Sequence, residues 1–238
     1  MANTFPGSGI GQVCENGGVN KRPYVPVPLS FVRCSAEESR ARAHGFCEQM
    51  RTRRSVRHFS REPIPIDAVE RCIDAAAQAP SGANKQPWTF VLVTDPLTKS
   101  AIREAAEQEE RAFYAGRASE RWIEDLAELG TGPDKPFLED APALIVIFAQ
   151  RHGTEMTDRH YYVMESVGIS VGFLLAGLHL AGFATLTHTP APMEFLRTLL
   201  NRPANERAFC IVPVGYPVSD CEVPDISRKD LKDVLIKA

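Results

Sequence analysis

The feature that most constrains the fold is an uncharged, mostly apolar stretch from Ser166 to Leu186. It is long enough to be considered as a membrane span, but it contains His179 and several glycines and lies between segments typical of strands. These interruptions favour a buried core helix. We predict a central helix from His160 to Gly182, with three glycines at which neighbouring backbone can approach closely: Gly168, Gly172 and Gly177.

Four short segments rich in aliphatic, β-branched or aromatic residues are predicted to be strands. One of them, Ala143 to Ala149, is a continuous apolar run, which is typical of a strand buried on both faces. The other three predicted strands are Trp88 to Thr94, Phe183 to Thr187, and Ala208 to Val214.

Helices are predicted around these strands from their end signals. Ser35 and Glu38 have the spacing of a capping box, which predicts a helix from there to about Met50. Asp67 opens a helix with apolar residues on one face, and Pro80 ends it. A further short helix is expected from Pro192 through Leu200.

The segment from Leu97 to about Asp125 is helical in composition, with many charges and few aliphatic residues. We predict a long exposed helix there, stabilised by charge pairs at i,i+4 spacing. A loop rich in glycine and proline, residues 130–136, ends it.

The cysteines and the start of the chain indicate the compartment. Six cysteines are scattered without C-x-x-C spacing or a clustered histidine, so we predict reduced thiols, no metal site and a reducing, cytoplasmic location. The start of the chain lacks the pattern of a secretory signal. It is rich in Gly, Asn and Pro, which predicts an extended arm over residues 1–34 before a single domain over residues 35–238.

A cluster of basic residues follows the first predicted helix. Arg53, Arg54 and Arg57 flank Ser55, and guanidinium groups beside a hydroxyl suit a phosphate or carboxylate. Short basic runs are more often solvated faces. Nucleic-acid binding is disfavoured because the net charge of the 238-residue chain is −3.

Several motifs, in order, resemble the nitroreductase-type flavoprotein superfamily. They are R-R-S-V-R at 53–57, A-P-S-G-A at 79–83 before a W-T-F strand, the glycine-rich helix, and P-V-G-Y-P at 213–217. Within that superfamily the chain is similar to the iodotyrosine deiodinase family. That closer resemblance rests on E-R-A-F-Y-A-G-R-A-S-E-R-W at 110–122, Lys135 before F-L-E-D-A-P, T-H-T-P at 187–190, and V-P-D-I-S-R-K at 223–229.

The resemblance implies an α+β nitroreductase-like fold, with a central mixed or antiparallel sheet flanked by helices in an intertwined homodimer. It also implies bound FMN. Arg57 would lie near the flavin pyrimidine edge, where a cation eases reduction, and the Thr189 hydroxyl near flavin N5 would favour one-electron steps. The residues implied in cofactor binding are Arg53, Arg54, Ser55, Arg57, Ser81, Gly82, Thr187, His188, Thr189 and Arg228.

For the substrate, the resemblance implies a lid that closes over a zwitterionic amino acid. Glu110 would take the ammonium, Lys135 the carboxylate, and Tyr114 would add a hydrogen bond. The Ala83 N–H would receive a phenolate oxygen, so that Ala83 and Thr189 are the implied catalytic positions. The implied reaction is reductive dehalogenation of halotyrosines, with FMN reduced by NAD(P)H directly or through a partner reductase.

Three departures and three alternatives accompany this resemblance. The membrane anchor of vertebrate members is missing here, which leads us to expect a soluble protein, and His188 stands where relatives often have a small hydroxyl residue. The segment after Tyr114 has small residues at Gly116 and Ala118, which leaves the exact substrate open. The alternatives are a general FMN-dependent reductase of nitroaromatics, quinones or other phenols, a flavin-binding module without turnover, and a nucleic-acid-binding protein.

Overall fold

The computed structural model describes residues 24–238, so most of the predicted arm lies outside the described residues. Residues 24–34 form no helix or strand and are mostly exposed. Backbone contacts divide the chain inside helix α1 (Ala36–Thr52), between Arg42 and Ala43, and residues 43–238 form one compact unit. The predicted domain boundary between residues 34 and 35 stays a prediction.

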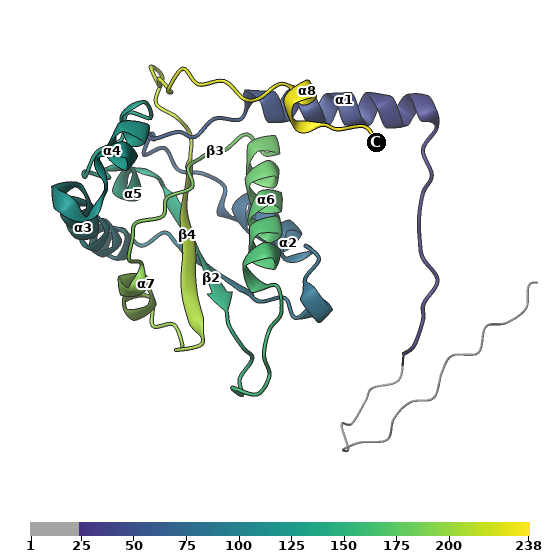
Figure 1. Cartoon of the computed structure of the whole chain (residues 1–238), viewed down its shortest axis with the longest axis horizontal. Coiled ribbons are helices and arrows are strands. Elements are labelled where there is room, and N and C mark those ends of the chain that lie inside the picture. Colours follow the sequence, from purple (N-terminus) through teal and green to yellow (C-terminus); the bar gives the residue numbers. More distant parts are fainter. Residues whose placement is uncertain (1–23) are drawn as a thin grey trace, which may run out of the picture. The chain divides into compact units, whose positions relative to one another are not determined.

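The compact unit is built on one four-stranded sheet (Figure 1). Its order is β1-β2-β4-β3, and each neighbouring pair is antiparallel. All four predicted strands are confirmed, although β3 is much shorter than expected. An isolated parallel bridge between Ser55 and Thr185 adds a fifth segment beside β3. The strands are β1 (Trp88–Val93), β2 (Ala143–Gln150), β3 (Ala184–Thr185) and β4 (Glu206–Gly215).

Two apolar clusters cover the two faces of the sheet, and β2 contributes to both. Ile145 and Ile147 point into the cluster with α2 (Ile66–Ala77) and α6 (Val163–Leu180). Leu144, Val146 and Phe148 point into the other cluster, which packs against α3 (Pro96–Ala112), α5 (Phe137–Asp140) and α7 (Glu194–Leu199). Because successive side chains of a strand face opposite ways, the apolar run of β2 fills both layers. The α+β prediction is confirmed.

The predicted helix ends agree with the structure to within a few residues. The Glu38 backbone N–H donates to Ser35 Oγ at 3.1 Å, as a capping box requires. The remaining short helices are the 3-10 turn Gly82–Asn84, the π turn Phe113–Arg117, α4 (Glu120–Ala127) and α8 (Leu231–Val234).

The prediction of one long exposed helix after Leu97 is wrong in two respects. α3 ends at Ala112, and the π turn breaks the helix at Gly116, whose φ is 153°. One face of α3 is also buried, at Ile102, Ala106 and Glu107 among others. The sequence shows few aliphatic residues there because small and charged side chains form that face.

The prediction of a buried core helix holds for only one face of α6. Val167, Val171 and Leu174 are buried, whereas Ile169 and Phe173 are exposed on the opposite face. By length and composition, α6 is also the one helix in the described part of the chain that could span a membrane. Within residues 43–238 its buried face packs on α2, which fixes its place beside the sheet.

A buried hydrogen bond joins α2 to α6, because Ser170 Oγ donates to the Ala76 carbonyl at 2.7 Å. Replacing Ser170 by alanine removes this donor at a fully buried position. We expect the free energy of unfolding to fall by about 1 kcal/mol in urea titrations at fixed protein concentration. The exposed Ser219→Ala is the control. Equal stability of the two variants would show that the bond contributes nothing.

Candidate active site

Residues from four separate segments meet around a cavity of about 290 Å³. The segment after α1 contributes Arg57, and the end of α3 with the π turn contributes Glu110 and Tyr114. The loop before α5 contributes Lys135. The segment after β3 contributes Thr187, His188 and Thr189. The structure thus brings together seven of the residues that the sequence singled out.

Backbone pairing with the sheet fixes the position of Arg57. The Val56 N–H donates to the Thr185 carbonyl at 3.0 Å, and the Ser60 N–H donates to the Tyr216 carbonyl at 2.8 Å. Val56 is buried, and its neighbour Arg57 is half-buried in the cavity wall. Burial lowers the pKa of Arg57. Among the described residues, no carboxylate forms an ion pair with Arg57, so its charge is available to a bound anion.

Lys135 and Glu110 form an ion pair in the cavity, with Lys135 Nζ 3.2 Å from Glu110 Oε2. The Lys135 side chain is only 4% exposed. Its ammonium also donates to Thr131 Oγ1 at 3.1 Å and to the Gly132 carbonyl at 2.6 Å. Burial lowers the pKa of Lys135, and the charge of Glu110 opposes this shift.

Tyr114 lies beside this ion pair. The Lys135 ammonium is 5.9 Å from the centroid of the Tyr114 ring, and the phenol donates to the Thr131 carbonyl at 3.2 Å. Burial and then the charge of Glu110 raise the pKa of Tyr114. The phenol therefore stays protonated near neutral pH and remains a hydrogen-bond donor.

His188 is held by the sheet and is buried between two exposed threonines. Its N–H and carbonyl each pair with the backbone of Ile211 at 2.8 Å, and its ring packs edge-on against Phe137 with centroids 5.3 Å apart. Its Nε2 is buried and has no hydrogen-bond partner among the described residues. Burial, followed by the charges of Lys135 and Arg57, lowers the pKa of His188 to about 3.

This pKa predicts a pH-dependent stability. In the folded protein His188 is neutral down to about pH 3, whereas in the unfolded chain it gains a proton near pH 6.5. The unfolded state binds more protons, so stability is lost as the pH falls from 6.5 toward 3. Between pH 7.5 and pH 5 the loss due to His188 is about 2 kcal/mol.

The measurement is urea unfolding of wild type and His188→Gln at pH 7.5 and pH 5. The variant should lose about 2 kcal/mol less than wild type over this range, because it lacks the imidazole that protonates on unfolding. The carboxylates common to both proteins cancel in the difference. Parallel losses in the two proteins would contradict a buried, neutral His188.

Four arginines line a second cavity, of about 310 Å³, that Arg57 does not line. They are Arg51 and the three that the sequence singled out, Arg53, Arg54 and Arg228; Lys229 and Asp230 line the cavity as well. Burial lowers the pKa of Arg53, and the nearby positive charges of Arg228 and Arg54 lower it further, because like charges repel. The Arg54 guanidinium donates to the Pro224 carbonyl. A phosphate is the ligand that such a set of donors fits, so these residues suit the phosphate of FMN.

Ser55 lies between Arg54 and Arg57 in the sequence. Together with Arg57 it lines a third cavity, of about 320 Å³. Segment 53–57 thus lines several cavities: Arg53 and Arg54 line one that Arg57 does not line, and Ser55 and Arg57 together line another. A segment with phosphate-type donors near one end and a further cation near the other suits an elongated ligand with one anionic end.

Ser81, Gly82 and Ala83 are not among the described residues that line these cavities. The Gly82 N–H donates to Ser166 Oγ at 3.3 Å, which places this loop at the start of α6. A Cβ on Gly82 would lie 2.7 Å from the Tyr161 carbonyl oxygen, so only glycine fits there. Ala83 has a left-handed backbone with φ of 49°. Within one chain, the loop is not joined to the other predicted site residues.

The sequence reasoning missed the apolar wall of the first cavity. Phe113 and Trp122 pack edge-to-face with centroids 5.0 Å apart, and Leu126 and Leu129 continue this wall. The spacing of residues 122, 126 and 129 on one helical face was the available signal. An aromatic and aliphatic wall in the same cavity as Arg57 and Lys135 suits a ligand with a flat ring and a charged head group.

Comparisons with known proteins identify the family of this chain. The model of the nitroreductase family matches residues 50–216. The chain is 49% identical over 215 residues to an iodotyrosine deiodinase of Haliscomenobacter hydrossis, which covers 88% of this chain and 96% of that protein. It is 42% identical to iodotyrosine deiodinase 1 of Homo sapiens, over 88% of this chain and 74% of that protein.

A solved structure gives the same result for the fold. A crystal structure of oxidised iodotyrosine deiodinase bound to FMN and 3-iodo-L-tyrosine superposes with a TM-score of 0.72 at 32% identity, over 81% of this chain and 97% of that chain. With the family model, the curated relatives and this structure in agreement, the chain belongs to the nitroreductase family, in the group whose members are named iodotyrosine deiodinases.

Proposed function

We propose that the protein is an FMN-dependent reductive dehalogenase that converts halotyrosines into tyrosine and halide. The observation that carries this proposal is the buried pair of Lys135 and Glu110. An α-amino acid has one carboxylate and one ammonium, and these are the complements of the two side chains. The pair lies in a cavity with an aromatic wall, where the ring of a tyrosine fits.

FMN is supported by the arginines of segment 53–57 together with Arg228. Arg53, Arg54 and Arg228 would hold the phosphate, and Arg57 would face the flavin ring. Bound FMN, once reduced, would supply the two electrons of the reaction. We further propose that these electrons come from NAD(P)H, directly or through a partner reductase.

The reaction is balanced by two electrons and one proton. The carbon–halogen bond of the substrate ring breaks, a C–H bond forms at the same carbon, and halide leaves with the bonding pair. Arg57, with no carboxylate ion-pair partner among the described residues, stabilises negative charge on the flavin side of the cavity. Tyr114 and the apolar wall hold the substrate ring and exclude water from it.

The active unit in this proposal is a homodimer. The exposed face of α6 carries apolar side chains, including Ile169 and Phe173, and a second copy of the chain would cover it. Ser81, Gly82 and Ala83 lie at the start of the same helix. In a dimer they could reach the flavin and the phenolate of the other subunit. Sedimentation equilibrium should give twice the chain mass of 26.3 kDa, and a monomer would exclude this arrangement.

The alternative function is a general FMN-dependent reductase of nitroaromatics, quinones or other phenols. In that case the cavity would receive a ring without an amino-acid head group. The buried pair of Lys135 and Glu110 argues against it, because a neutral ring gains nothing from two buried charges.

Ligand binding separates the two functions. The fluorescence of the bound flavin is titrated with iodo-, bromo-, chloro- and nitrotyrosine, and with the corresponding halophenols. A dehalogenase of halotyrosines should bind the amino acids at least tenfold more tightly than the phenols, which is about 1.4 kcal/mol. Equal affinity for both sets would favour the general reductase, and a purified protein without flavin colour would exclude both.

A further inference from the structure

α3 holds Lys135 at two points that are one helical turn apart. Glu110 Oε2 pairs with the Lys135 ammonium at 3.2 Å, and Glu107 Oε1 accepts the Lys135 backbone N–H at 2.8 Å. Residues three apart lie on the same face of a helix, so the two carboxylates face Lys135 together. One of them fixes the lysine's charged end and the other fixes its backbone.

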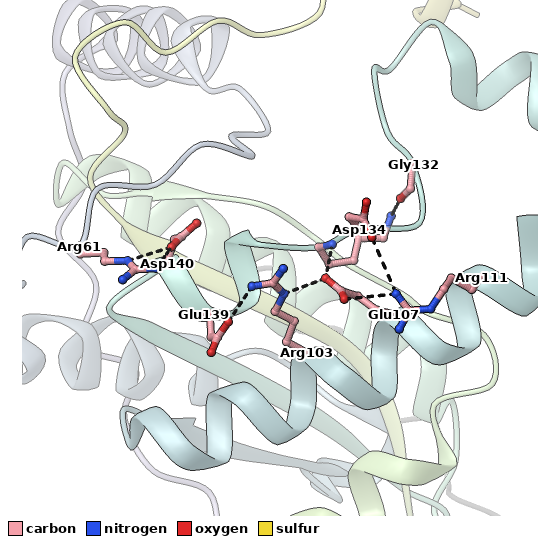
Figure 2. A network of polar contacts seen from close by, with 9 residues as sticks. Arg61, Arg103, Glu107, Arg111, Gly132, Asp134, Glu139 and Asp140 are labelled. Carbon is pink, nitrogen blue, oxygen red and sulfur yellow. Dashed lines mark hydrogen bonds and ion pairs between the residues drawn. The ribbon is translucent and has the colours of Figure 1, made fainter.

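Two arginines, Arg103 and Arg111, hold the Glu107 carboxylate, as Figure 2 shows. Arg103 Nε donates to Glu107 Oε1 at 2.7 Å, and Arg111 Nη1 lies 3.6 Å from Glu107 Oε2. Arg103 is in turn anchored to Glu139 at 2.7 Å. Burial alone would raise the pKa of Glu107, but the hydrogen bonds from Arg103 and from the Lys135 N–H hold it below the usual range.

The loop before Lys135 depends on this anchor. The ammonium bonds within its own loop, to Thr131 and Gly132, and Asp134 lies a distant 3.8 Å from Arg111. The Lys135 N–H is therefore the short, buried hydrogen bond that joins the loop to α3 through its backbone. Without it, the loop would be joined to α3 and the π turn by the ammonium that the substrate must use, by the pair of Asp134 with Arg111 at 3.8 Å, and by the Tyr114 phenol on the Thr131 carbonyl.

We propose that Glu107 is a positioning residue for the substrate: it anchors the Lys135 backbone, so that the ammonium of Lys135 can exchange Glu110 for a substrate carboxylate without the loop leaving α3. This inference rests on the proposed function, because it assigns the carboxylate of an amino acid to Lys135. Glu107 does not line the cavity. Its effect is to keep the lysine within reach, which lowers the entropy lost on binding.

Two substitutions separate the reach of Glu107 from its charge. Glu107→Gln keeps an oxygen at the same distance, and therefore keeps the acceptor for the Lys135 N–H. Glu107→Asp keeps the charge, but its shorter side chain withdraws the acceptor. If the role of Glu107 is to position Lys135, Glu107→Asp should weaken substrate binding strongly and Glu107→Gln only slightly.

The first measurement is calorimetric titration of the flavin-loaded variants with 3-iodotyrosine. We expect Glu107→Asp to weaken binding at least tenfold and Glu107→Gln to weaken it less than threefold, with the flavin content of both unchanged. The matched control is Glu206, a second buried carboxylate that pairs with an arginine at i,i+4 spacing, 2.7 Å from Arg202. Glu206→Asp should leave iodotyrosine affinity within twofold of wild type.

The second measurement is hydrogen exchange of the loop, which requires no substrate. The amides of Thr131, Gly132, Asp134, Lys135 and Phe137 should exchange faster in Glu107→Asp than in wild type, and at nearly the wild-type rate in Glu107→Gln. The proposal is overturned if the loop exchanges equally in all three proteins, if Gln weakens iodotyrosine binding as much as Asp does, or if Glu206→Asp weakens it equally.

The failure of this inference can be told from the failure of the proposed function. If wild type does not bind 3-iodotyrosine, the proposed function fails and the substrate role of Glu107 is lost with it. Hydrogen exchange then still decides whether Glu107 anchors the loop. If wild type binds iodotyrosine and the Asp variant binds it equally well, only the positioning role fails.

Discussion

Replacing Lys135 by methionine is expected to weaken 3-iodotyrosine binding by on the order of a hundredfold, with no loss of bound flavin. The methionine keeps most of the apolar stem in this buried position but removes the ammonium. The substrate carboxylate then enters the cavity without its partner, and Glu110 loses the cation that lies 3.2 Å away. Truncating one partner of a buried charge pair costs roughly 2–5 kcal/mol in binding.

The measurement is titration of the bound flavin's fluorescence, and Lys99→Met is the control. Lys99 is also a buried lysine of this region, and its ammonium donates to the carbonyls of Glu139 and Ala141. It does not line the cavity, so its loss should reduce stability and leave iodotyrosine affinity unchanged. Wild-type affinity in Lys135→Met would remove the head-group recognition on which the proposed function depends.

Reversing the charge of Arg53 is expected to reduce the flavin bound per chain to less than a tenth of the wild-type value. Arg53, Arg54 and Arg228 meet at one cavity, and their mutual repulsion is part of the reason why the pKa of Arg53 is lowered, after burial. An anionic phosphate relieves this repulsion. Arg53→Glu places a carboxylate where the phosphate would bind, so attraction becomes repulsion.

The ratio of flavin to protein absorbance after gel filtration measures this effect. Arg71→Glu is the control, because Arg71 is an exposed residue of α2 whose ion-pair partner, Asp74, lies on the same helix. The control should retain full flavin content. A fully loaded Arg53→Glu protein would show that the three arginines do not hold the phosphate, and the cofactor would have to be placed elsewhere.

The strands could be predicted from the sequence because local pattern and tertiary environment agree there. The apolar run of β2 is buried on both faces, and its two sets of alternate side chains fill two separate clusters. α3 was misjudged for the opposite reason. Its buried face includes Lys99 and Glu107, which are satisfied by partners far along the chain, and no local pattern reveals such partners.

The candidate site was predicted in part. The family motifs indicated Arg57, Glu110, Tyr114 and Lys135 as site residues, and the structure brings them to one cavity. The role of Ser81, Gly82 and Ala83 stays a prediction, because their loop lies at the start of α6 and needs a second chain to approach the cavity in our proposal.

His188 and Glu107 show what motif reasoning leaves out. The sequence placed His188 between two threonines but could not show that its Nε2 would be buried without a described partner. Glu107 looked like one of many surface charges on a helix. Its importance comes from the Lys135 N–H that it accepts, which only the folded chain brings within 2.8 Å.

The central claim is that this protein removes halogen from a tyrosine ring by reduction. The most direct test is to reduce the flavin-loaded protein with dithionite in the absence of oxygen, add 3-iodotyrosine, and quantify iodide, tyrosine and flavin oxidation. The account predicts one iodide and one tyrosine for each flavin reoxidised, and the same stoichiometry with bromotyrosine. Unchanged iodotyrosine beside a flavin that is readily reoxidised by a nitroaromatic compound would contradict it.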